Sequence, residues 1–152
     1  MILEHDASGR LRGFLASEDD YQFLKSMHRR NLIVPITGDL AGAQTLPGIG
    51  RFLGEINERV SVLYVSNVED YLLQDGTFGS YLTGVRALPR DNQAVVIRSY
   101  FGSGYGHPEA TAEYHATQLL QSLSAFVADT ALLRPMRYRE LVNRNWIPLR
   151  EP

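Results

Sequence analysis

Residues 60–76 read VSVLYVSNVEDYLLQDG, and this stretch predicts a buried strand that leads directly into a helix. Its first six residues are mostly apolar and β-branched, which is typical of a strand covered on both faces of a parallel sheet. Ser66 or Asn67 can cap the following helix, whose first turn is acidic, as the helix dipole favours. A strand followed at once by a helix is the repeating unit of α/β folds.

Two further apolar runs predict strands, one on each side of this stretch in the chain, at 32–37 and 94–100. Pro35 in the first run cannot donate to a sheet ladder, so that strand belongs at an edge or ends early. Apolar residues at helical spacing predict helices around the strands, and the first begins with a capping box from Ser17 to Asp20. The helices are expected at 18–30, 41–56, 68–73, 77–87, 108–128 and 136–145.

This alternation of helices and strands predicts an α/β fold, a three-layer Rossmann-like sandwich with a mainly parallel sheet and right-handed crossovers. A full doubly wound domain contains more than three strands. The predicted sandwich is therefore either a small Rossmann-like domain or only part of a full one. We expect a single domain over residues 1–152. Residues 1–16 are a lead-in, 17–106 the βα core and 107–152 the C-terminal helices.

Composition excludes several classes of protein. The chain has 152 residues, a formal net charge of −2 and no basic excess, which argues against nucleic-acid binding. It has no cysteine, so disulfides, thiolate zinc sites and cysteine nucleophiles are absent. No apolar run reaches the length of a membrane span, and the start of the chain does not resemble a signal peptide. The sequence therefore predicts a cytoplasmic protein that does not bind membranes.

Three segments resemble one family of proteins. They are FLASEDDYQFLKSMHRRNLIVPITGDLAG (14–42), VSVLYVSNVEDYLLQDG (60–76) and VVIRSYFGSG (95–104). In this order they resemble an uncharacterised bacterial family of Rossmann-like proteins, which are similar in fold to class I methyltransferases. The resemblance implies a Rossmann-like fold with S-adenosylmethionine as the cofactor. It also implies a short or N-terminally truncated member, because longer relatives carry a further α/β segment ahead of the matched part.

The loops after the three predicted strands carry the candidate cofactor-binding residues, since ligands of α/β sheets bind beyond the carboxyl ends of the strands. Glycines there let backbone N–H groups approach a ligand, and carboxylates can accept hydrogen bonds from a ribose. Structural explanations stay open, namely helix capping for the first two loops and flexibility for the glycine-rich third. No catalytic residue is assigned. The candidates are Thr37, Gly38, Asp39, Ser66, Asn67, Glu69, Gly102 and Gly104.

Other polar and aromatic residues have two interpretations each. Glu109 and Glu113 share a face of the predicted helix 108–128 and could bind a metal with His107, while His115 lies off that face. A solvated helix face explains them better, so no metal is predicted. Arg98 can pair with an acidic ligand group or with a carboxylate of the protein. Three tyrosines can stack on a base or pack in the core: Tyr100, Tyr105 and Tyr114.

Two functions are compatible with these features. The first is a methyltransferase-like domain that binds S-adenosylmethionine or a nucleotide at the strand ends. The second is a non-catalytic subunit that completes an oligomer or a partner's sheet, because a short parallel sheet leaves at least one edge unpaired. A homo-oligomer or a partner chain is therefore expected. The segment 132–136 with Trp146 and Ile147 is a second candidate surface, unless the tail covers the edge within one chain.

Overall fold

The computed structural model divides the chain into two compact units, residues 1–37 and residues 38–152. The elements, in chain order, are α1 (Glu18–Arg29), α2 (Thr45–Glu55), β1 (Val60–Ser66), α3 (Val68–Gln74), α4 (Phe78–Arg86), β2 (Arg90–Phe101), β3 (Ala116–Ser122), α5 (Leu123–Ala128), α6 (Tyr138–Val142) and β4 (Trp146–Ile147). The structure describes residues 5–6, 8–11, 13–101, 107–110, 114–129, 132 and 134–148.

Helix α1 dominates the first unit and begins as the sequence predicts. The Ser17 hydroxyl accepts a hydrogen bond from the backbone N–H of Asp20 at 3.1 Å and donates one to the Asp20 carboxylate at 2.7 Å. Asn31, with a left-handed φ of 53°, follows the helix and ends it. None of the α1 residues is buried.

Residues 32–37 correct the first strand prediction. This segment is not part of any strand, and Leu32, Val34 and Ile36 are all exposed. An apolar run predicts that a segment can enter a sheet, but it does not provide the neighbouring strand that a ladder needs. Pro35 also removes one of the N–H groups with which the segment could bond.

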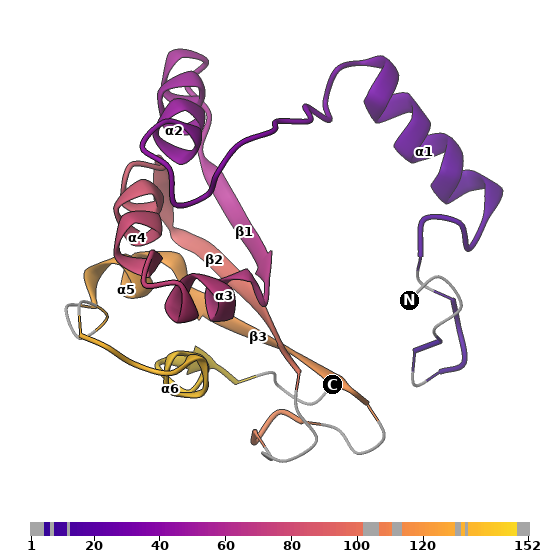
Figure 1. Cartoon of the computed structure of the whole chain (residues 1–152). Helices are drawn as coiled ribbons and strands as arrows, with labels where there is room; N and C mark the ends of the chain where they lie inside the picture. Colours follow the sequence, from indigo (N-terminus) through magenta and orange to yellow (C-terminus); the bar gives the residue numbers. More distant parts are fainter. Residues whose placement is uncertain are drawn as a thin grey trace. The chain divides into compact units, whose positions relative to one another are not determined.

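The second unit contains one four-stranded mixed sheet of order β1-β2-β3-β4, which overturns the prediction of a mainly parallel Rossmann-like sandwich. Strands β1 and β2 are parallel, whereas β3 pairs antiparallel with β2, and β4 antiparallel with β3. The parallel pair agrees with the sequence, because α3 and α4 form the crossover that parallel neighbours require. Figure 1 shows β1, β2 and β3 side by side.

The region after residue 107 is the largest error in the predicted elements. A single helix was expected over 108–128, but the structure has a turn at Pro108, then strand β3, then the short helix α5. The leucines at 119, 120 and 123 fit a helical stripe and an extended strand almost equally well. Short apolar runs do not distinguish the two, and here the free edge of β2 favours the strand.

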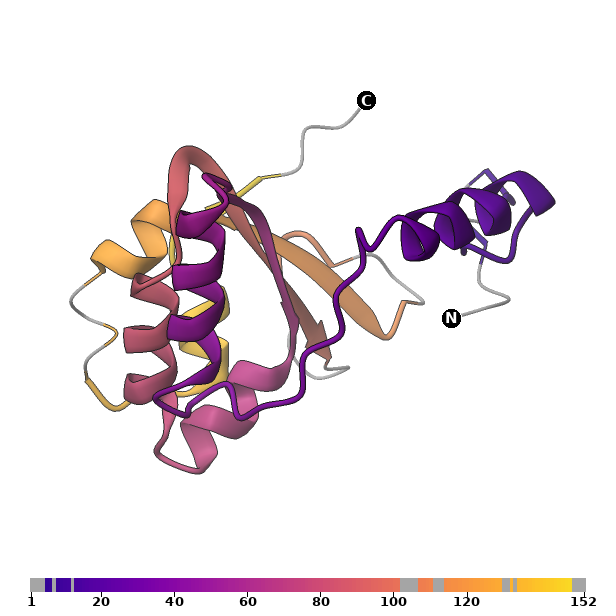
Figure 2. The same cartoon turned by 90° about the horizontal axis from the view of Figure 1, so that it is seen from above.

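The helices of the second unit cover one face of the sheet (Figures 1 and 2). The core lies between these layers and includes Val65, Val96, Leu119, Leu82 and Phe126, all buried. Helices α2 and α4 approach closely, because a Cβ at Gly84 would lie only 3.0 Å from the Cβ of Leu46. Among the helices that the structure describes, none is long and apolar enough to cross a membrane.

The opposite face of the sheet carries an uncharged row of side chains that runs over all four strands. Tyr64 pairs with Ile97, Ile97 with Leu120, and Leu120 with Ile147. These residues are half-buried or exposed, whereas their neighbours in β2 on the other face are buried. The second unit is therefore a two-layer arrangement, with helices on one face and an open apolar face on the other.

Candidate functional site

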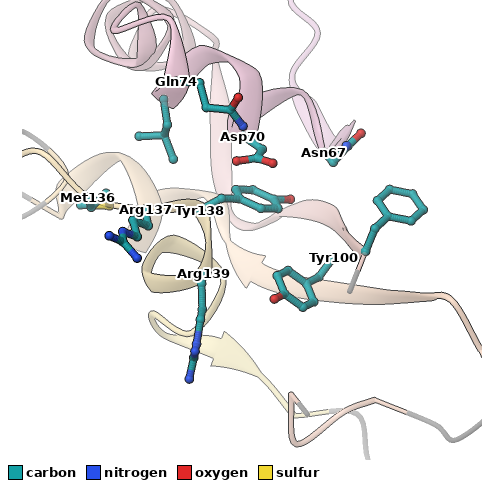
Figure 3. Close-up of a pocket in the computed structure, with 10 residues that line it drawn as sticks. Asn67, Asp70, Gln74, Tyr100, Met136, Arg137, Tyr138 and Arg139 are labelled. Carbon is teal, nitrogen blue, oxygen red and sulfur yellow. The ribbon is translucent and has the colours of Figure 1, made fainter. Parts of the chain in front are cut away.

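A cleft of about 520 Å³ lies where the parallel strands β1 and β2 end (Figure 3). Asn67 follows β1, and Tyr100 and Phe101 form the end of β2, so two of its walls come from the carboxyl ends of these strands. Helix α3 supplies a third wall, and the segment that opens α6 closes the cleft. The lining residues are Asn67, Asp70, Leu73, Gln74, Tyr100, Phe101, Met136, Arg137, Tyr138 and Arg139.

Tyr138 holds α6 against both strands and so shapes the cleft. Its hydroxyl donates to the backbone carbonyl of Ser99 at 2.9 Å and lies 3.3 Å from that of Ser66. The rings of Tyr138 and Tyr100 stack with their centroids 6.2 Å apart and an interplanar angle of 26°. Ser66 ends β1 with a left-handed φ of 50°, which turns the chain sharply into α3. Tyr100, Phe101 and Tyr138 form an aromatic wall of the cleft, and hydrogen bonds to the backbone of the sheet hold Tyr138 in it.

The cleft carries charges of both signs. Figure 3 shows the carboxylate of Asp70 beside the ring of Tyr138, with the amide of Gln74 on the same side. Arg137 and Arg139 are exposed at the opposite wall. Carboxylates and amides can bind hydroxyl and amino groups, and guanidinium groups can bind phosphates or carboxylates.

A buried polar network stands in the core close to these elements. Glu69 and Arg98 form an ion pair in which the guanidinium engages both carboxylate oxygens, with side-chain exposures of 0% and 2%. Arg98 also donates to the amide oxygen of Gln121 at 2.7 Å, and the Tyr81 hydroxyl donates to Glu69 at 3.1 Å. The Arg98 guanidinium lies over the ring of Phe126, 4.5 Å from its centroid. The network joins α3, α4, β2, β3 and α5.

Burial changes the acidity of two tyrosines near this network. The pKa of Tyr81 is raised well above its usual value, first because the hydroxyl is buried and then because the charge of Glu69 disfavours a second anion. Burial likewise raises the pKa of Tyr138, again reinforced by Glu69. Both hydroxyls therefore remain neutral hydrogen-bond donors at neutral pH.

The structure separates the predicted site residues. Asn67 lines the cleft, and Ser66 lies directly before it at the end of β1. Glu69 is in the core, where Arg98 and Tyr81 occupy its oxygens, so it does not face the cleft. Arg98 pairs with Glu69, which was one of the two alternatives for it. Gly102 and Gly104 lie outside the described residues.

The loop before α2 does not reach the cleft. Gly38 and Asp39 open the second unit, while Thr37 belongs to the first. The Asp39 carboxylate accepts a hydrogen bond from the backbone N–H of Ala41 at 2.8 Å, which closes a local turn. The N-cap of α2 is Gln44, so Asp39 does not cap that helix either.

The residues considered for a metal form a different arrangement. His107 is buried and accepts a hydrogen bond at Nδ1 from the backbone N–H of Glu109, at 3.1 Å. Its ring meets that of Trp146 edge-on, and the Trp146 indole donates to the Glu109 carboxylate at 3.2 Å. Burial lowers the pKa of His107, although the charge of Glu109 opposes this shift. Glu113 lies outside the described residues, and within them no three carboxylate or imidazole groups gather.

Sequence reasoning missed most of the cleft. Tyr100 was considered for stacking, but Asp70, Gln74 and the Arg137–Arg139 segment were not assigned to a site. A signal was present, because two arginines flank a tyrosine directly before a short helical pattern. Its significance depends on the chain returning to the ends of β1 and β2, and nothing near residue 137 in the sequence indicates this.

Comparison with known families matches residues 2–146 to a domain of unknown function, DUF7790. The chain belongs to this family. No curated protein matches the chain. Membership in DUF7790 carries no assigned activity, so the resemblance to methyltransferase-like proteins stays a prediction. What this DUF7790 domain does must be inferred from its own cleft and surfaces.

Proposed function

We propose that this domain binds a small adenosine-bearing ligand with an anionic group, either S-adenosylmethionine or an adenine nucleotide, in the cleft at the ends of β1 and β2. The observation that supports the proposal is the combination of aromatic residues, the carboxylate-bearing Asp70 and the exposed Arg137 in the lining of one cleft. The site also lies where ligands of parallel strands are usually bound. Methyl transfer follows only if the ligand is S-adenosylmethionine, since that reaction depends on positioning more than on acid–base groups.

Each class of lining residue has a place in this proposal. The purine stacks on the aromatic wall, where Phe101 is exposed. Asp70 accepts hydrogen bonds from ribose hydroxyls, as acidic residues do in dinucleotide sites. Arg137 pairs with the phosphate or carboxylate of the ligand. The absence of cysteine removes any need for an oxidising compartment, and we propose that the binding takes place in the cytoplasm.

Calorimetry with four ligands tests the proposal. Adenosine, AMP, S-adenosylmethionine and S-adenosylhomocysteine share the purine and the ribose but differ in their charged groups. We expect a heat of binding with AMP or with the two S-adenosyl compounds. Adenosine, which lacks the anionic group, should bind more weakly. Binding of AMP alone identifies a nucleotide site, and binding of the S-adenosyl compounds alone identifies a cofactor site. No heat at millimolar ligand, with the fold confirmed by circular dichroism, refutes the proposal.

Two variants locate the binding. Arg137→Gln should weaken the binding of anionic ligands about two- to tenfold, because an exposed charge pair contributes on the order of 1 kcal/mol. The same variant should leave adenosine unaffected. Arg134→Gln is the matched control, since Arg134 is exposed in the same segment but does not line the cleft. Equal losses in both variants would show non-specific attraction of the anion instead of a site.

A further inference from the structure

Strand β1 forms an edge of the sheet and carries no charged side chain. Within the described part of the chain it pairs with β2 on one side only, so N–H and C=O groups on its other side have no ladder partner. Protected edge strands are short, contain β-bulges, or carry lysine, proline or inward-pointing charges. The seven residues of β1, VSVLYVS, include no lysine, proline or charged residue. Its register with β2 is regular from Val62 to Tyr64 and shifts on either side of this stretch. The opposite edge strand, β4, is only two residues long.

The side chains of β1 add apolar surface to this edge. Val62 is 51% exposed and Tyr64 is 59% exposed, although both lie in the part of β1 that pairs with β2 in continuous register. They continue the open apolar face, because Val62 lies beside Val95 and Tyr64 beside Ile97. A strand that is both uncharged and apolar on its exposed face fits another uncharged strand, since no like charges would meet across the junction.

We infer that β1 pairs antiparallel with β1 of a second copy across a two-fold axis, which joins the two four-stranded sheets into one. A two-fold axis perpendicular to the sheet makes neighbouring strands antiparallel and the contact self-complementary. When the axis passes between Leu63 of one copy and Leu63 of the other, the regular part of β1 from Val62 to Tyr64 lies opposite the same part of the second copy. Val62 then lies opposite Tyr64 of the second copy, on the same face of the sheet. This interface is separate from the cleft and does not depend on the proposed ligand.

Light scattering coupled to size exclusion tests the assembly. At micromolar concentration we expect twice the mass of one chain. Tyr64→Lys should give a monomer with unchanged circular dichroism, because the side chain is exposed and the two-fold axis brings the new charges close together. Gln118→Lys is the matched control, since Gln118 is exposed in β3, away from the β1 edge. A monomeric wild-type protein, or a dimer that Gln118→Lys but not Tyr64→Lys dissociates, overturns the edge pairing.

Cysteine pairing tests the register, and the absence of natural cysteines removes any background. The variants Val62→Cys and Tyr64→Cys are made separately, mixed and oxidised. Residues directly opposite in an antiparallel pair have Cα atoms about 4.5–5.5 Å apart, within the range of a disulfide. The mixture should therefore form a crosslinked dimer, whereas Val62→Cys alone should crosslink much less. A dimer that crosslinks in neither experiment contradicts pairing through β1.

Discussion

The two faces of the sheet differ in the chemistry that they bury. On the helix-covered face, Val96 is fully buried and Arg98 is paired with Glu69, so both apolar and charged groups are enclosed. On the open face, Tyr64 remains exposed although it stands in a strand of the same sheet. The difference shows that apolar strands in a sequence are not sufficient to predict a three-layer fold. Helices must be available to cover the second face, and in the described second unit they all lie on the first (Figure 2).

The largest expected effect lies in the covered face. Glu69→Gln keeps the shape of the side chain but leaves the buried charge of Arg98 without its counter-ion. We expect a loss of about 3–5 kcal/mol in the free energy of unfolding, measured with urea. The control Glu58→Gln changes an exposed carboxylate and should alter stability by less than about 0.5 kcal/mol. Similar stabilities for the two variants would contradict a structural role for the ion pair.

The helix layer itself is tested by two glycines of α2. A Cβ at Gly50 would lie 2.5 Å from the backbone oxygen of Ala87, so Gly50→Ala should force α2 away from this segment. We expect a loss of about 1–3 kcal/mol from such overpacking. Gly54 has no atom within 4 Å of the added Cβ, and Gly54→Ala should stabilise the helix by about 0.5–1 kcal/mol. Thermal unfolding of both variants measures the contrast, and shifts of the same sign would disprove the close approach.

The comparison between the faces can be made within a single strand. Val96 faces the helices and is fully buried, whereas its neighbour Val95 faces the open side and is partly exposed. Val96→Thr should lower the free energy of unfolding by about 1–3 kcal/mol, because it buries a hydroxyl. Val95→Thr should lower it by less than about 0.5 kcal/mol. Urea unfolding at low protein concentration measures both. A large effect at Val95 would mean that the open face is covered in solution.

The smallest effect is a pH dependence at high pH. The pKa of Tyr138 is raised in the folded protein by burial, so above about pH 10 the unfolded chain loses this proton first. Stability present below pH 10 is then lost as the pH rises, by up to about 1.4 kcal/mol per pH unit. Tyr138→Phe should lower the free energy of unfolding by about 1 kcal/mol at neutral pH, because a hydrogen bond is lost. The stability of this variant should also decrease less steeply as the pH rises. Unfolding curves between pH 9 and 11 measure the slope, and equal slopes would refute the assignment.

Local patterns predicted most elements correctly up to residue 101. The capping residue Ser17, the helices α2 and α4, and the strand β1 depend on neighbouring residues in the chain, and all were confirmed. The parallel pairing of β1 with β2 was also confirmed, because the helices between the strands leave that connection as the natural one. Within the candidate site, Asn67 was predicted at the cleft for the same reason, since it follows a strand that the sequence identifies clearly.

By itself, then, the sequence determined where the chain is helical or extended wherever one local pattern dominates. The tertiary structure alone decided what each segment meets. It left residues 32–37 outside the sheet, made a strand of residues 116–122, and enclosed Glu69 with Arg98 instead of placing it at the cleft. The physical reason is that sheet pairing, charge burial and cleft formation depend on partners distant in the chain. Arg137 illustrates this, because it reaches the ends of β1 and β2 only when the chain folds back.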